Sequence, residues 1–145
     1  MSVTSIDGTG EIVPEPDWES LFSDVLERAT ASEHWRLLTT ELKERGLLAP
    51  ANSHSLQRLV NAYLVYDRMA REVAEHGAVS KPKRGNPKSI ARISPYFTAM
   101  REAGSDAAVL EAELGLSPRR RGAVTKAERK QKVARASDAY LRKRD

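Results

Sequence analysis

Residues 53–76 read SHSLQRLVNAYLVYDRMAREVAEH and form the longest helical pattern in the chain. Their apolar residues recur three and four positions apart, the spacing that aligns side chains on one face of an α-helix. These residues are Leu56, Leu59, Val60, Tyr63, Tyr66, Ala70, Val73 and Ala74, with Ala62, Leu64 and Met69 beside them. Together they cover about half of the helix circumference, more than an ordinary surface helix shows. We therefore predict one helix that other elements cover on two sides.

The ends of this helix carry local signals. Asn52, Ser53 and Ser55 are candidate N-caps, and Gly77 is suited to the position after the last turn. Next comes Ala78–Lys88, where cations alternate with two prolines and a glycine that exclude regular helix. We expect a basic loop or a loose hairpin here.

Two helical patterns precede the long helix. The acidic segment Asp17–Ala29 predicts a helix with its first residue as the N-cap. A capping-box spacing between Thr30 and Glu33 predicts that a second helix restarts there and runs to Arg45, with Gly46 ending it. The expected inward residues are Trp18, Leu21, Phe22, Val25, Leu26 and Ala29 in the first helix, and Trp35, Leu38 and Leu42 in the second.

One more helical pattern follows the basic loop. Ser94 and Pro95 suit the N-cap and first position, and Gly115 suits the end. Gly104 marks a point where this helix bends or is crossed closely. Ser117 and Pro118 then repeat the starting signal, but the apolar stripe beyond them is too thin for a core.

These patterns predict an all-α fold with a helical core of about four helices. We divide the chain into a flexible acidic arm at 1–16, a helical core and oligomerisation domain at 17–116, and a basic C-terminal helix or tail at 117–145. The core is one modest domain for a chain of 145 residues.

Composition excludes several kinds of site. The chain has no cysteine, and its three histidines share no ligand spacing, so we expect no metal centre and no cofactor. No stretch has the apolar length of a membrane span, and the first residues lack a signal-peptide pattern, so we expect a cytoplasmic protein without a membrane partner. Asp67 is the best candidate general base, but a pair with Arg71 is the simpler interpretation. No catalytic residue is assigned, and we expect no enzymatic activity.

Charge is segregated along the chain. Residues 1–33 hold eight acidic residues against Arg28, a net charge of −7, whereas residues 117–145 hold eleven basic residues against three acidic ones, a net charge of +8. Such segregation suggests a polyanion partner at the basic end, with a solvated tail as the alternative.

The layout from Ser32 to Val124 resembles the P27 type of phage terminase small subunit. The resemblance rests chiefly on Leu114-Gly115-Leu116-Ser117-Pro118 followed by arginines, together with the upstream Asn86-Pro87. It implies a non-catalytic packaging factor of a tailed bacteriophage that forms a homo-oligomeric ring and binds double-stranded viral DNA. It also implies delivery of that DNA to the large terminase subunit, which carries the ATPase and nuclease, in the host cytoplasm rather than in the mature virion.

We expect phosphate contacts from the basic loop and from the basic C-terminal segment, which position DNA without reading its sequence. The candidate DNA-binding residues are Lys81, Lys83, Arg84, Lys88, Arg92, Arg119, Arg120, Arg121, Lys126, Arg129, Lys130 and Lys132. One alternative is a small dimeric helix-turn-helix regulator, although the long helix begins with only Gln57 and Arg58 for base contacts. Another is a scaffold whose basic tail binds an acidic protein.

Overall fold

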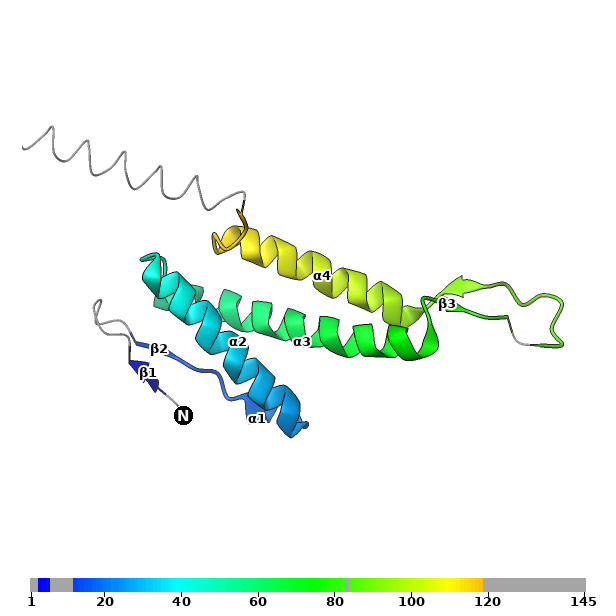
Figure 1. Ribbon diagram of the computed structural model, residues 1–145, viewed down its shortest axis with the longest axis horizontal. Helices are drawn as coiled ribbons and strands as arrows, with labels where there is room; N and C mark the ends of the chain where they lie inside the picture. Colours follow the sequence, from blue (N-terminus) through cyan, green and yellow to red (C-terminus); the bar gives the residue numbers. More distant parts are fainter. Residues whose placement is uncertain (1–2, 6–11, 83, 119–145) are drawn as a thin grey trace, which may run out of the picture.

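The computed structural model describes residues 3–5, 12–82 and 84–118, and these are mostly helical (Figure 1). The helices are α1 (Trp18–Leu21), α2 (Val25–Glu44), the 3₁₀ turn η1 (Pro50–Asn52), α3 (Ser53–His76) and α4 (Pro95–Glu113). The strands form two antiparallel pairs, β1 (Val3–Ser5) with β2 (Ile12–Pro14) and β3 (Val79–Ser80) with β4 (Arg92–Ile93). The predicted all-α class is confirmed.

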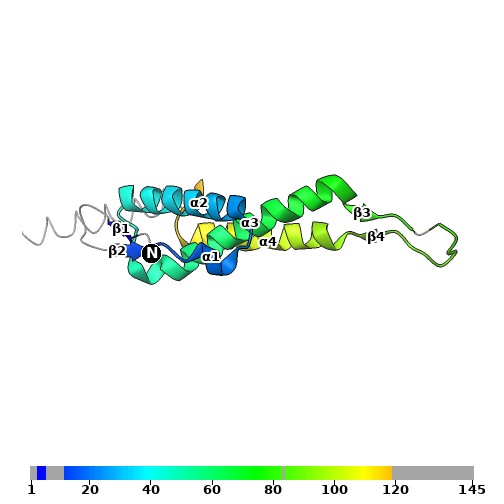
Figure 2. The same ribbon diagram turned by 90° about the horizontal axis from the view of Figure 1, so that it is seen from below.

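The α3 and α4 helices run antiparallel along the long axis of the molecule. The α2 helix lies across α3, and the far ends of α3 and α4 project beyond it toward the β3–β4 hairpin (Figures 1 and 2). The core lies under the crossing, where Trp18 packs edge-on against Trp35 at a centroid distance of 6.1 Å. The largest fully buried side chains are Trp35, Leu42, Leu56, Leu59, Val13 and Val60.

Left-handed glycines end α2 and α4, as predicted. Gly46 has φ +68° and Gly115 has φ +75°. In each case the N–H of the following residue bonds back across the last turn at 2.8 Å, which is the Schellman arrangement. Arg45 Nη1 also donates to the carbonyl oxygen of Gly115 at 3.1 Å, so this arginine ties the two helix ends together.

The first helical segment breaks earlier than expected, and the predicted restart at Thr30 is wrong. The break lies between α1 and α2, where the Asp24 carboxylate accepts from the Leu26 N–H at 2.9 Å as the N-cap of α2. Arg28 Nε donates to the carbonyl oxygen of Phe22 at 2.7 Å, at the end of α1. Thr30 is interior to α2 and donates its hydroxyl to the Leu26 carbonyl. The three-residue spacing between Thr30 and Glu33 also occurs in the interior of a helix, so it does not by itself mark a helix start.

This break changes which apolar residues face the core. Trp18 and Phe22 are buried as expected, whereas Leu21, Val25 and Leu26 are 51%, 71% and 75% exposed. Ala29 is exposed as well. The inward assignment of these four residues is wrong because the helical period was counted continuously across a break that resets it.

The segment before α1 contributes to the core, which its composition did not indicate. Val13 in β2 is 1% exposed. The Glu15 carboxylate accepts from Trp18 Nε1 at 2.9 Å and from Ser32 Oγ at 2.5 Å, linking this segment to α1 and α2. Residues 13–15 therefore pack on the helices.

The α3 helix has the predicted bounds and ends at Gly77, with φ +86°. Asn52 occupies the N-cap position, but its side chain donates to the Leu47 carbonyl instead of capping. The buried residues of α3 all lie in its first half, and beyond them Tyr66 is 40% exposed. Among helices of the described ranges, none has the length and apolar character needed to cross a membrane.

Candidate nucleic-acid interface

The basic loop is a β-hairpin at the outer end of the α3–α4 pair (Figures 1 and 2). In its ladder Val79 faces Ile93 and Ser80 faces Arg92. The Ser94 N–H donates to the Ala78 carbonyl at 2.9 Å, which closes the base of the hairpin beside the first turn of α4. Two antiparallel helices thus hold a two-stranded arm away from the core.

The tip of the hairpin contains a formed turn. The Ser89 N–H donates to the Asn86 carbonyl at 3.0 Å, and the Lys88 N–H donates to Asn86 Oδ1 at 3.0 Å. Pro87 occupies the second position of this turn, where its fixed φ is favourable. Gly85 precedes the turn with φ +91°, a conformation that favours glycine. The sequence therefore shapes the tip before any partner binds.

Positive charge on this arm is not neutralised locally. Lys81, Arg84, Lys88 and Arg92 are all exposed, and within the described residues none of them forms an ion pair. The sequence has no acidic residue from Gly77 through Arg101. These four side chains are available to an anionic partner.

The structure brings together only part of the predicted DNA-binding set. Lys81, Arg84, Lys88 and Arg92 share the hairpin. The other predicted residues lie outside the described residues, and they are Lys83, Arg119, Arg120, Arg121, Lys126, Arg129, Lys130 and Lys132.

Two features of this region were missed at the sequence level. Arg101 lies on α4, with its guanidinium carbon 6.0 Å from the centre of the Phe97 ring. The hairpin also exposes three apolar side chains, Val79 at 53%, Ile90 at 75% and Ile93 at 61%. Their signal was present in the sequence, because large aliphatic residues are unexpected in a loop rich in proline and lysine.

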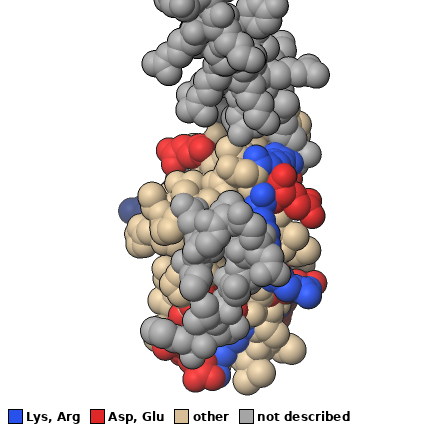
Figure 3. All heavy atoms as spheres, turned by 90° about the vertical axis from the view of Figure 1, so that its left-hand side faces the viewer, with Lys and Arg blue, Asp and Glu red and all other residues tan. Residues whose placement is uncertain are grey.

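The opposite end of the molecule has a different charge character. Figure 3 looks at that end and shows basic and acidic side chains interspersed over the visible described surface. The Arg45–Glu41 ion pair within the last turn of α2 is one example of this local pairing. The described surface visible at this end therefore lacks the unpaired positive charge that the described residues of the hairpin carry.

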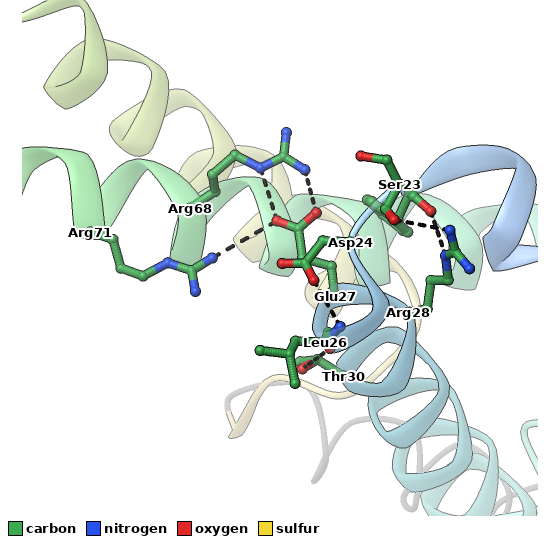
Figure 4. Close-up of polar contacts among 9 residues, drawn as sticks. Ser23, Asp24, Leu26, Glu27, Arg28, Thr30, Arg68 and Arg71 are labelled. Carbon is green, nitrogen blue, oxygen red and sulfur yellow. Dashed lines mark hydrogen bonds and ion pairs between the residues drawn. The ribbon is translucent and has the colours of Figure 1, made fainter.

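Polar contacts fix α3 against both neighbours. The Tyr63 hydroxyl donates to Glu111 Oε1 on α4 at 2.6 Å. Burial, and then this hydrogen bond, raise the pKa of Tyr63 above its usual value. On the other side, Arg68 Nε and Nη2 donate to the two oxygens of Glu27 at 2.9 and 2.6 Å (Figure 4). These hydrogen bonds raise the pKa of Arg68 above its ordinary value.

The Glu27 contact also corrects the interpretation of Asp67. Arg71 Nη2 lies 3.8 Å from Glu27 Oε1, so its ion pair is with α2 and not with Asp67 (Figure 4). Asp67 itself is exposed, outside the apolar arc.

Among the described residues, a hollow of about 450 Å³ beside α1 is lined by residues 15–19, Arg28 and Ser32. Two weaker candidate sites involve α3. Glu72, Glu75 and His76 place their ligand atoms within 4.8 Å of one another at the end of α3. His76 Nδ1 already lies 3.1 Å from the Glu72 carbonyl oxygen, and two of the three residues are exposed. A shallow groove of about 290 Å³ between α3 and α4 has an alanine floor, including Ala62 and Ala103. This volume is at the lower limit for ligand pockets.

Comparison with known proteins identifies the family of the chain. The family described as phage terminase, small subunit matches residues 31–131, or 101 of the 145 residues. No curated protein and no solved structure matches the chain. The matched range includes most of α2, the whole α3–hairpin–α4 unit, and the glycines at the ends of α2, α3 and α4. The chain therefore belongs to the phage terminase small subunit family, whose members take part in packaging phage DNA.

Proposed function

We propose that this protein binds double-stranded phage DNA through the β3–β4 hairpin and presents it to the large terminase subunit. The observation that carries the proposal is the unneutralised charge of Lys81, Arg84, Lys88 and Arg92 on an arm that projects from the helical core. Side chains of this kind release counterions from DNA when they contact phosphates. Such contacts position the protein without reading bases.

We further propose that the protein is of the P27 type, acts without catalysis and assembles as a ring. A closed ring would carry one hairpin per subunit. Weak phosphate contacts made by several hairpins at once would bind DNA more tightly than one hairpin does. Leu21 at the end of α1 and Val25 and Leu26 at the start of α2 are exposed, and they support contacts between subunits because exposed apolar surface often marks a protein–protein contact. Light scattering during size exclusion tests this, since a monomeric mass at high and low salt would contradict the ring.

The salt dependence of DNA binding tests the hairpin directly. In the variant Lys81→Ala/Arg84→Ala/Lys88→Ala, the plot of log affinity against log salt for random duplex DNA should flatten. Each lost contact removes about 0.9 from the slope, so the expected change is about 2.7 for each bound subunit.

A matched control neutralises three cations of the helical body, Arg36→Ala/Lys43→Ala/Arg58→Ala. This control should keep both the affinity and the slope of the natural protein. An unchanged slope in the hairpin variant would remove the hairpin from the DNA site. Among the described residues, no separate observation favours the transcription-regulator alternative.

A further inference from the structure

The hairpin combines its cations with apolar side chains that the helical core does not cover. Ile90, at 75% exposed, follows directly after the Asn86–Ser89 turn, and Pro87 at the second position of that turn is also exposed. Val79 and Ile93 form an exposed cross-strand pair at the base of the same arm. Phosphate contacts alone do not account for aliphatic surface at these positions.

Base-edge reading by Arg84 or Arg92 would use their guanidinium groups, so it does not by itself explain aliphatic surface at the tip. Residues 81–92 contain a single side-chain amide, that of Asn86, and its oxygen already accepts the Lys88 N–H. The tip therefore offers lysine and arginine donors beside proline and isoleucine surface. Proteins that bend DNA from the minor groove use this combination, in which an apolar wedge enters between base steps while nearby cations hold the backbone.

We infer that Ile90, supported by the Pro87 turn, inserts as a wedge into the minor groove and bends the DNA that the hairpin binds. This inference rests on the proposed DNA binding by the hairpin. The preformed turn holds the wedge in place before contact, so less ordering is needed on binding. Lys88 is next to Pro87 in the turn and Arg92 is two residues beyond Ile90, so both are placed for the phosphates on either side of the distorted step.

Bending is measured by energy transfer between dyes on the two ends of a short duplex, with the full-length protein. The natural protein should bend the duplex by about 20 to 90°. Ile90→Ser should lose at least half of this bend and keep the salt slope, because no cation is removed. Ile90→Leu should keep the bend, and Leu37→Ser should keep it as a matched control, since Leu37 is 57% exposed on α2 far from the hairpin.

The other outcomes overturn the inference in distinguishable ways. Binding without bending, or full bending by Ile90→Ser, refutes the wedge and leaves DNA binding by the hairpin intact. Absence of duplex binding by the natural protein refutes both proposals. A changed assembly mass for Ile90→Ser with an unchanged bend would assign Ile90 to a contact between subunits instead.

Discussion

Replacing Arg68 with alanine tests whether one ionic contact holds α2 in place on α3. The side chain of Glu27 is 9% exposed and that of Arg68 is 46% exposed. Both guanidinium hydrogen bonds to Glu27 are short, at 2.9 and 2.6 Å, and they join residues 41 positions apart in the chain. The substitution leaves a buried carboxylate with Arg71 as its remaining charge partner, 3.8 Å away.

The magnitude follows from how well water can replace the lost guanidinium. Removing one partner of a fully buried pair costs about 3 to 5 kcal/mol, whereas an exposed pair contributes about 0 to 1 kcal/mol. Because Arg68 is half exposed and Arg71 remains, we expect a loss of about 2 kcal/mol in the free energy of unfolding. For a core of this size the melting temperature should fall by about 6 to 12 °C.

Denaturant unfolding at a fixed protein concentration measures this loss, since any oligomer would make stability depend on concentration. Arg71→Ala is the matched control, and its 70% exposed side chain predicts a cost below about 0.5 kcal/mol. A double-mutant cycle with Glu27→Ala should give a coupling of at least about 1 kcal/mol between Glu27 and Arg68. Equal losses of stability for Arg68→Ala and Arg71→Ala, or a Glu27–Arg68 coupling near zero, would refute the view that the Glu27–Arg68 ion pair holds α2 on α3.

The remaining predictions concern Tyr63 and two glycines. Burial and the bond to Glu111 raise the pKa of Tyr63, so its stabilising effect is complete below about pH 10 and is lost as the pH rises further. Above pH 10, the free energy of unfolding of the natural protein should therefore fall by up to about 1.4 kcal/mol per pH unit more than that of Tyr63→Phe, as measured by denaturant unfolding. Parallel plots of unfolding free energy against pH for the two proteins would contradict this. Gly104→Ala should stabilise the interior of α4 by about 0.5 to 1 kcal/mol, because a new Cβ would lie 3.4 Å from the Tyr66 ring, in ordinary contact. Gly46→Ala should instead lower the free energy of unfolding by about 1 kcal/mol, because alanine is strained at φ +68°. A change of stability in the same direction for both glycine variants would refute this argument.

Local signals predicted the elements whose ends are set by local chemistry. The bounds of α3 and the glycine ends of α2 and α4 were correct, because positive φ at Gly46, Gly77 and Gly115 is a property of a few consecutive residues. The break before α2 was misplaced because Arg28 reaches back to the Phe22 carbonyl, a contact six residues apart that no periodicity reports. Burial of Val13 likewise depends on helices that come later in the chain.

The candidate interface was predicted in its charges, and its hairpin was one of the two shapes that the sequence left open. Lysine and arginine between prolines indicated an exposed cationic segment, and Lys81, Arg84, Lys88 and Arg92 are exposed. The pairing of β3 with β4 involves only two residues on each strand, too few for an alternating pattern. The exposure of Ile90 was missed because one isoleucine in a loop has no periodic neighbour to mark its face, although an aliphatic residue among prolines and lysines was itself a signal.

The broad apolar arc of α3 shows a second limit of periodicity, since the pattern reports which face is apolar but not what covers it. In the first half of α3 the cover comes from the same chain, and Leu56, Leu59 and Val60 are fully buried. Just before Arg68, which pairs with Glu27 of α2, Tyr66 lies against Gly104 of α4 yet remains 40% exposed. The Glu27–Arg68 ion pair therefore lies at the boundary between the three-helix core and the two-helix arm that carries the hairpin. Within that arm α3 and α4 pack on each other, and at its outer end the His76 ring lies 5.7 Å from the Tyr96 ring. The position of the hairpin relative to the core therefore depends mainly on this α3–α4 packing, which no periodicity in the sequence reports.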